Sequence, residues 1–137
     1  MKRLTSVFAS LLLGVAGLLP VANAADTVLV SQAELLKRLE QKDPELVVLD
    51  VRTADEFAAG HVPGARNVSH DVLAARIEEL SAARDKQVVL YCRSGRRTLL
   101  AEDVLRKAGF TRLGHLEGDY LAWEAEKRPV ERSAPAK

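Results

Sequence analysis

The sequence predicts an α/β domain with a mainly parallel sheet, and three observations support that prediction. Segments rich in β-branched and apolar residues alternate with segments of helical periodicity along the chain. Two strand-like segments, residues 46–49 and 88–90, are continuous apolar runs, which are typical of strands covered by helices on both faces. No internal repeat or long linker divides the 137 residues, so we expect one domain.

The first half of the chain begins with a short strand and a capped helix. Ser31-Gln32-Ala33-Glu34 matches a capping box, which opens a helix that Asp43-Pro44 ends. In chain order, the expected elements are a strand over 27–30, a helix from 31, a strand over 46–49, a helical turn over 55–59 and a strand over 65–69.

The second half repeats the alternation of helix and strand. Apolar residues spaced by three and four predict a helix over 72–80. The amphipathic pattern over 95–108 predicts another helix, with Leu100, Val104 and Leu105 facing inward. The remaining expected elements are strands over 87–91 and 112–116, a last helix from Asp119 through Trp123, and a flexible tail from about residue 128.

The N-terminal segment has the features of a secretory signal peptide. Lys2 and Arg3 precede an apolar run over 7–19, and Ala22-Asn23-Ala24 matches a cleavage site. An uncleaved anchor is the alternative, but the run is shorter than the roughly 20 residues that span a membrane. We therefore expect cleavage of residues 1–24 and a single periplasmic domain over 25–137 that no longer contacts the membrane.

Charge and cysteine content restrict the function. Without Lys2 and Arg3, the chain has one fewer basic residue than its 19 acidic residues, which argues against a sequence-independent nucleic-acid binder. Cys92 is the sole cysteine, so no intramolecular disulfide can form. A lone cysteine in an exported protein is either buried and inert or a reactive thiol.

The position of Cys92 favours the reactive thiol. It directly follows the strand over 87–91 and precedes the helix that begins near Gly95, and ligands of open α/β sheets bind at the carboxyl ends of strands. Amide groups of the loop can form an anion-binding nest, and the helix N-terminus adds positive potential. Arg93, Arg96 and Arg97 reinforce it, so the loop favours a thiolate.

Four blocks of this sequence resemble the rhodanese superfamily, and together they extend from residue 30 to residue 123. They are Leu49-Asp50-Val51-Arg52 with Glu56-Phe57; Gly60-His61-Val62-Pro63-Gly64-Ala65 with Asn67; Cys92-Arg93-Ser94-Gly95-Arg96-Arg97; and Gly109-Phe110 with Leu116, Gly118 and Trp123. The resemblance implies the rhodanese-like fold, a five-stranded parallel sheet with helices on both faces. In one departure, Gly118-Asp119 replaces two glycines; we expect Asp119 to cap the last helix without affecting the catalytic residues.

The resemblance also implies a sulfurtransferase in which Cys92 carries sulfur as a persulfide. Cys92 would take sulfur from thiosulfate or a similar anionic donor and pass it to cyanide or an acceptor thiol, for example that of a periplasmic protein. The backbone of residues 93–97, including Ser94 and Gly95, would bind the anion. The arginine side chains would attract the donor. Arg97 has two open roles, donor binding or an internal ion pair.

Other candidate residues favour structural roles. Asp50 and Arg52 stand at a strand end as possible secondary site residues, although a structural pairing, for example of Arg52 with Glu56, is favoured. His61 is expected to stabilise a turn and Trp123 to lie in the core. One cysteine and three scattered histidines predict no metal site, and no cofactor is expected.

Two other functions remain as alternatives. A cysteine phosphatase or arsenate reductase would bind an anion over a similar loop, but a phosphatase loop has arginine at the position of Thr98, one residue beyond Arg97. A sulfur-carrier or binding module without enzymatic turnover is the second alternative. Steady-state turnover with small donors would separate a carrier from an enzyme.

Overall fold

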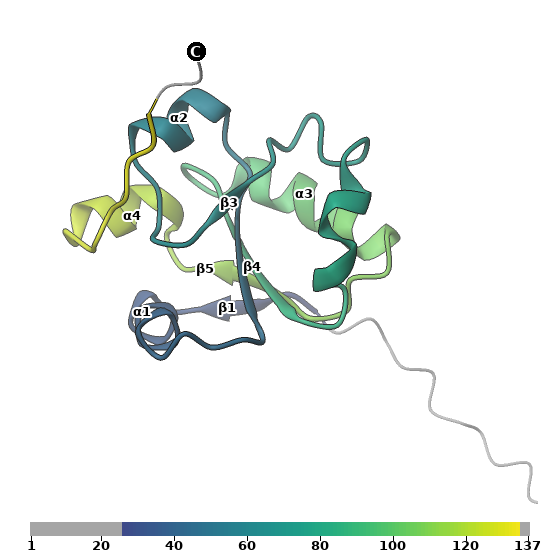
Figure 1. The fold of residues 1–137 in the computed structure, drawn as a ribbon, viewed down its shortest axis with the longest axis horizontal. Helices are drawn as coiled ribbons and strands as arrows, with labels where there is room; N and C mark the ends of the chain where they lie inside the picture. Colours follow the sequence, from purple (N-terminus) through teal and green to yellow (C-terminus); the bar gives the residue numbers. More distant parts are fainter. Residues whose placement is uncertain (1–25, 135–137) are drawn as a thin grey trace, which may run out of the picture.

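Five parallel strands form one sheet in the computed structural model, which describes residues 26–134 (Figure 1). The strand order is β1-β5-β4-β2-β3, which confirms the predicted fold class. The strands are β1 (Val28–Val30), β2 (Leu46–Asp50), β3 (Arg66–Asn67), β4 (Gln87–Tyr91) and β5 (Leu113–Leu116). The expected signal peptide lies outside the described residues.

Helices cover both faces of the sheet, and each face has its own apolar core. Leu49, Val88 and Leu90 face α3 and η1, whereas Val48, Val89 and Tyr91 face α1 and α4. This alternation along β2 and β4 explains why both strands are continuous apolar runs. The helices are α1 (Gln32–Glu40), α2 (Ala54–Ala59), η1 (Ile77–Ala83), α3 (Arg96–Lys107) and α4 (Asp119–Ala125).

Side-chain caps fix the starts of α1 and α2. The Ser31 hydroxyl accepts the Glu34 N–H, as the sequence pattern predicts. A full capping box, absent from the sequence-based expectations, opens α2: Thr53 Oγ1 accepts the Glu56 N–H, and the Glu56 carboxylate accepts the Thr53 N–H. These contacts with Thr53 fix the position of the Glu56 side chain independently of its contacts with distant residues.

The expected helix over 72–80 is wrong in type and position. Turns occupy residues 71–76, and the helix that follows is the 3₁₀ helix η1. Residues three apart share one side of a 3₁₀ helix, so the partly buried Ile77 and the buried Leu80 and Ala83 face the sheet together.

The inward face of α3 also differs from the prediction, because Leu100 is 57% exposed. The buried residues on α3 are Thr98, Ala101, Glu102 and Leu105. Two of these, Thr98 and Glu102, are polar and form hydrogen bonds with other elements. Those bonds offset the burial of polar groups that an apolar periodicity cannot anticipate.

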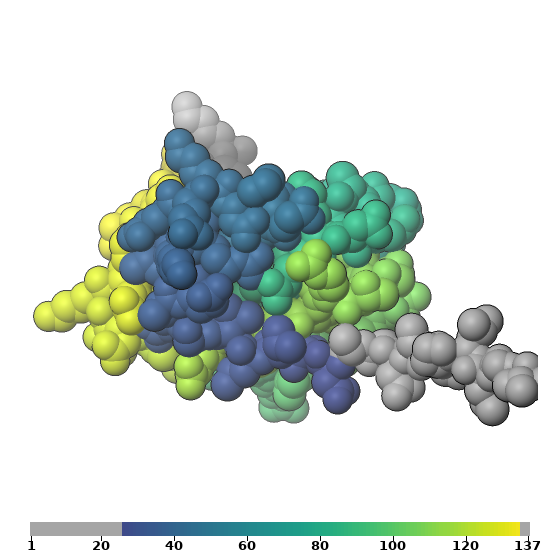
Figure 2. All heavy atoms as spheres, turned by 90° about the horizontal axis from the view of Figure 1, so that it is seen from below, coloured from purple at the N-terminus to yellow at the C-terminus, as the bar shows by residue number. Residues whose placement is uncertain are grey.

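The tail does not fray at residue 128, in contrast to the prediction. The Arg128 N–H donates to Trp123 O, and Glu131 forms an antiparallel bridge with His61. The fully buried Trp123 donates its indole N–H to Pro129 O at 2.8 Å, as expected for a core tryptophan with a satisfied polar atom. Figure 2 shows the C-terminal segment against the N-terminal part of the domain.

Candidate active site at the Cys92 loop

Cys92 occupies the turn between β4 and α3, at the carboxyl edge of the sheet. Its backbone is held from both sides, since its N–H donates to Asp119 Oδ1 at 3.0 Å and its carbonyl accepts the Tyr120 N–H at 3.0 Å. The side chain is 1% exposed, and its Sγ accepts the Gly95 N–H at 3.0 Å. The sulfur therefore already has one amide donor of the kind that stabilises an anion.

Glycine at position 95 is a geometric requirement of the loop. Its φ is +108°, a backbone conformation that residues with a side chain rarely adopt. A Cβ atom there would also lie 3.0 Å from Asp119 Oδ2. Gly95 thus allows the chain to curl over the Asp119 carboxylate and to direct its N–H at the sulfur.

Arg93 and Arg96 have the freedom that a donor-binding role requires. Both side chains are exposed, and neither has a side-chain hydrogen bond or ion pair in residues 26–134. A hollow of about 170 Å³ lies beside the loop. It is lined by Arg52, Glu56, Ala59, Gly60, Arg93, Tyr120, Leu121 and Glu124. Ser94 is also exposed, so one side of the loop is open to solvent.

Arg97 forms an internal ion pair, one of the two roles left open by the sequence. Its guanidinium contacts the Glu56 carboxylate with two hydrogen bonds, of 2.7 and 3.0 Å, which join α3 to α2. The Arg97 bonds and the Thr53 contacts lower the Glu56 pKa to about 2. The Arg97 pKa is raised, first by Glu56 and further by nearby Cys92. Arg97 therefore also adds positive charge at the thiol.

Arg52 forms a structural ion pair, as the sequence favoured, but its partner is Asp50 rather than Glu56, the example given. Arg52 is 3% exposed, and its Nη2 lies 2.6 Å from Asp50 Oδ2. Burial alone would lower the Arg52 pKa, but the Asp50 hydrogen bonds and charge raise it. The guanidinium also packs over the rings of Tyr91 and Tyr120 and donates to Gly60 O. Both Asp50 and Arg52 thus support the wall of the hollow.

Asp119 and His115 are the site residues that sequence reasoning missed. Gly118, in the left-handed conformation, is the N-terminal cap of α4, whereas Asp119 is the first helical residue and has a φ of +54°. Its carboxylate accepts hydrogen bonds from the Cys92 N–H and the Thr98 hydroxyl and lies 2.9 Å from His115 Nε2. The expected capping role is therefore wrong.

His61 is structural, as predicted. Its Nδ1 donates to Phe57 O at 2.7 Å, its ring stacks on Phe57 with centroids 3.7 Å apart, and its backbone pairs with Glu131. It is 5% exposed and holds the segment after α2 against the tail. This segment includes Gly60, which accepts the Arg52 hydrogen bond.

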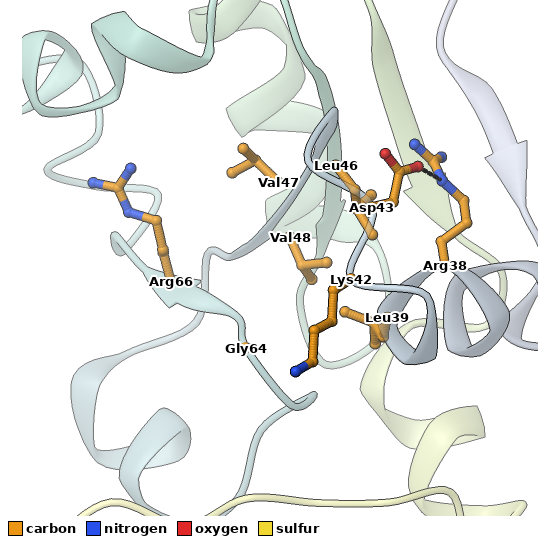
Figure 3. Close-up of a pocket in the computed structure, with 9 residues that line it drawn as sticks. All are labelled: Arg38, Leu39, Lys42, Asp43, Leu46, Val47, Val48, Gly64 and Arg66. Atoms are coloured by element: carbon orange, nitrogen blue, oxygen red, sulfur yellow. Dashed lines mark hydrogen bonds and ion pairs between the residues drawn. The ribbon is translucent and has the colours of Figure 1, made fainter.

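A second hollow of about 170 Å³ lies between α1 and β2 and has different chemistry (Figure 3). Val47, Val48 and Leu39 contribute apolar surface, with Lys42 and Arg66 at the margins. Arg38 is neutralised there by Asp43 at 2.8 Å. No residue of the Cys92 loop lines it, whereas Arg93 of that loop lines the hollow described above.

Residues 26–134 hold neither a metal-binding group of side chains nor a membrane-spanning helix. They contain no group of three or more histidine, cysteine, aspartate or glutamate side chains placed to hold a metal ion. No helix within them has the length and apolar character needed to cross a membrane.

Comparison with known proteins establishes the class of protein that this fold and cysteine loop define. Residues 31–126 match the family described as Rhodanese-like domain. A sulfurtransferase of Allochromatium vinosum is 33% identical over 101 residues, which cover 74% of this chain and 92% of the relative. The chain belongs to the rhodanese-like family.

Other relatives differ in length and in name. A rhodanese-related protein of Thermoplasma volcanium superposes with a TM-score of 0.65 at 26% identity, covering 76% of this chain and 97% of that one. An HTH-type transcriptional regulator of Mycobacterium tuberculosis is 38% identical over 123 residues, and the match covers 84% of this chain but only 52% of the regulator. The chain thus spans about half of that relative.

Proposed function

We propose that this protein is a thiosulfate sulfurtransferase that carries sulfur as a Cys92 persulfide. The observation that supports this most strongly is the Gly95 N–H on Cys92 Sγ at 3.0 Å, inside a loop whose exposed Arg93 and Arg96 have no side-chain partner in the described part of the chain. An amide aimed at the sulfur stabilises an anionic thiolate or persulfide. Exposed cations attract an anionic donor. The sulfurtransferase among the relatives supports the same class.

The reaction divides into two displacements. The Cys92 thiolate attacks the outer sulfur of thiosulfate, a new S–S bond forms, and sulfite leaves with the electron pair of the old S–S bond. Cyanide or an acceptor thiolate then attacks the terminal sulfur of the persulfide, and the Cys92 thiolate leaves. Neither step needs an external oxidant or reductant, so the reaction requires no redox cofactor. Covalent catalysis in two steps predicts ping-pong kinetics.

The direct test is mass spectrometry of the purified protein after incubation with thiosulfate. We expect a gain of one sulfur on Cys92, lost again on addition of cyanide. Cys92→Ser should abolish both the mass gain and thiosulfate:cyanide turnover while circular dichroism shows an intact fold. Substantial turnover by folded Cys92→Ser protein would overturn the mechanism.

The same measurements separate the alternative functions. A sulfur carrier would accept sulfur from a partner protein but would show no steady-state turnover with thiosulfate and cyanide. A phosphatase or arsenate reductase is disfavoured because Thr98 replaces the arginine of that loop and is buried, with its hydroxyl bonded to Asp119 at 3.1 Å. It contributes no positive charge toward a phosphate.

We also propose that the mature protein begins at Ala25 and works in the periplasm with a small anionic donor. The support is the short apolar run that ends in Ala22-Asn23-Ala24. N-terminal sequencing of the protein from its native host should give Ala25 as the first residue. Finding Met1 there would refute the export.

A further inference from the structure

A row of buried and partly buried polar side chains begins next to Cys92. Asp119 is 4% exposed, and its Oδ1 accepts the Cys92 N–H at 3.0 Å and the Thr98 hydroxyl at 3.1 Å. Its Oδ2 lies 2.9 Å from His115 Nε2. One carboxylate therefore connects the end of β4, the first turn of α3, β5 and the start of α4.

The row continues from His115 to the outer side of α3. His115 Nδ1 is 3.1 Å from Glu102 Oε1, in an orientation that leaves this oxygen without a hydrogen bond, so their attraction is one of charge. Glu102 is 4% exposed; its Oε2 accepts the Thr27 hydroxyl at 3.0 Å and lies 3.6 Å from Arg106. With His115 protonated, negative and positive groups alternate from Asp119 to Arg106.

The backbone at Asp119 is held in a conformation that favours glycine. Its φ of +54° is sparsely populated by residues with a side chain, although aspartate tolerates it better than most. Gly95 packs against the same carboxylate, since a Cβ at position 95 would lie 3.0 Å from Asp119 Oδ2. The strained residue and the glycine turn thus place the carboxylate and the cysteine loop in contact.

We propose that Asp119 is a positioning residue for Cys92, with His115, which itself contacts Glu102, holding its carboxylate in place. Asp119 binds the Cys92 N–H and so fixes the cysteine backbone from below, while the Gly95 N–H contacts the sulfur from the loop. The proposal rests on the proposed function only for the measurements that follow sulfur transfer. The state of the thiol can be measured without any sulfur donor.

Electrostatics give this role a pH dependence. The His115 imidazole is faced by Asp119 from α4 and by Glu102, with Arg106 behind it, from α3; its sheet neighbours on β1 and β4 are Leu29 and Leu90. The His115 pKa is raised by its carboxylate neighbours, Asp119 first. As pH rises through that pKa, His115 loses its proton, and the Asp119 charge is no longer balanced and opposes a thiolate or persulfide anion on Cys92. Turnover should therefore fall as pH rises, in a step that needs both residues.

Two substitutions at Asp119 separate the hydrogen bond from the charge. Asp119→Gly suits a φ of +54° but removes the acceptor, whereas Asp119→Asn keeps an acceptor for the Cys92 N–H and removes the charge. Lys127→Gly is the matched control, because Lys127 is exposed, has a φ of 53° and lies beyond α4. The measurements are the rate of Cys92 alkylation by iodoacetamide, and kcat and KM for thiosulfate with cyanide across pH.

We expect Asp119→Gly to lower the alkylation rate and kcat by about tenfold, equivalent to about 1.4 kcal/mol, with KM unchanged. Asp119→Asn should restore most of kcat at neutral pH and lose the fall of turnover with rising pH. Lys127→Gly should match the unmodified protein. Wild-type alkylation and kcat in Asp119→Gly, or no rescue by asparagine, would overturn the proposal.

The outcomes remain distinct if one part fails. If Asp119→Gly does not fold, the pH profile of Asp119→Asn decides, and a fall of turnover with rising pH that persists in it contradicts the proposal. If the unmodified protein takes no sulfur from thiosulfate but Asp119→Gly still slows alkylation, the positioning role stands and the proposed function fails.

Discussion

Two groups of ionic side chains flank Cys92 along the sheet, and they differ in the cation at their centre. On the β2 side, Arg52 pairs with Asp50 and Arg97 with Glu56. On the β5 side, His115 lies between Asp119 and Glu102. Arginine keeps its charge at every physiological pH, whereas histidine loses its proton within that range. The β2 group therefore gives a constant framework, and the β5 group can respond to pH.

Burial deepens this contrast. The Asp50–Arg52 side chains are 0% and 4% exposed, those of Glu56 and Arg97 are 32% and 25% exposed, and that of His115 is 18% exposed. A buried pair is strongly destabilised by loss of one partner, whereas a partly exposed pair contributes little. The following substitutions test how the burial of each pair and the identity of its cation determine its contribution to stability and its pH dependence.

The largest effect should come from Asp50→Asn, which leaves the buried Arg52 charge without its carboxylate. We expect a loss of about 3–5 kcal/mol in the free energy of unfolding. Urea denaturation of the two proteins at pH 7 measures it. A loss below about 1 kcal/mol would show that the two tyrosine rings and Gly60 O compensate the charge.

The next effect concerns Arg93 and Arg96, the exposed cations of the Cys92 loop. Arg93→Ala with Arg96→Ala should raise KM for thiosulfate by roughly tenfold at low salt, and the change should shrink as salt screens the field. Arg84→Ala with Arg112→Ala is the matched control, because it removes the same charge near the amino ends of β4 and β5. An unchanged KM for thiosulfate at low ionic strength would show that Arg93 and Arg96 are solvated surface charges that do not attract the donor.

His115→Gln should destabilise the protein by about 1 kcal/mol, allowing for solvent screening, and only at pH values where His115 is protonated. The hydrogen bond to Asp119 and the nearby carboxylates raise the His115 pKa, despite partial burial. Its contribution is thus fully present below the unfolded value of 6.5 and disappears as pH rises through the folded pKa. The free energies of unfolding of the two proteins should converge as pH rises above 6.5; a constant difference would contradict the ion pair.

The smallest effect should follow Glu56→Gln, about 0.5–1 kcal/mol at pH 7, because the pair with Arg97 is partly exposed. The Glu56 pKa is lowered from 4.5 to about 2, chiefly by Arg97. The stabilisation is therefore present above pH 4.5 and is lost as pH falls toward 2. In acid titrations, the difference in the free energy of unfolding between the two proteins should be constant above pH 4.5 and should disappear as pH falls toward 2.

The sequence allowed prediction of the features that local pattern determines. The apolar runs of β2 and β4, the Ser31 cap and the loop from Cys92 to Arg97 all follow from neighbours in the chain. Pairings across elements do not. Arg52 could reach Asp50 or Glu56 by sequence separation alone, and only the packing of α2 beside α3 assigns Glu56 to Arg97.

Asp119 shows why the rest of the site could not be predicted from the sequence. A carboxylate after a glycine is a common helix cap, and nothing local indicates that it instead accepts an N–H from residue 92. The error at Leu100 has the same origin, since Thr98 and Glu102 turn inward to meet partners on α4 and near β1. Buried polar contacts between distant segments decided both cases.

The pairing of β1 with β5 has a consequence for folding during synthesis. Val28 lies beside Gly114, and Val30 beside Leu116, so the first strand has the last strand as its neighbour. The register of β2 and β4 can form earlier, but β1 gains a neighbour only after residues through 116 have left the ribosome. Closure of so long a loop carries a large entropic cost, which slows folding. The first strand made is thus among the last to be ordered.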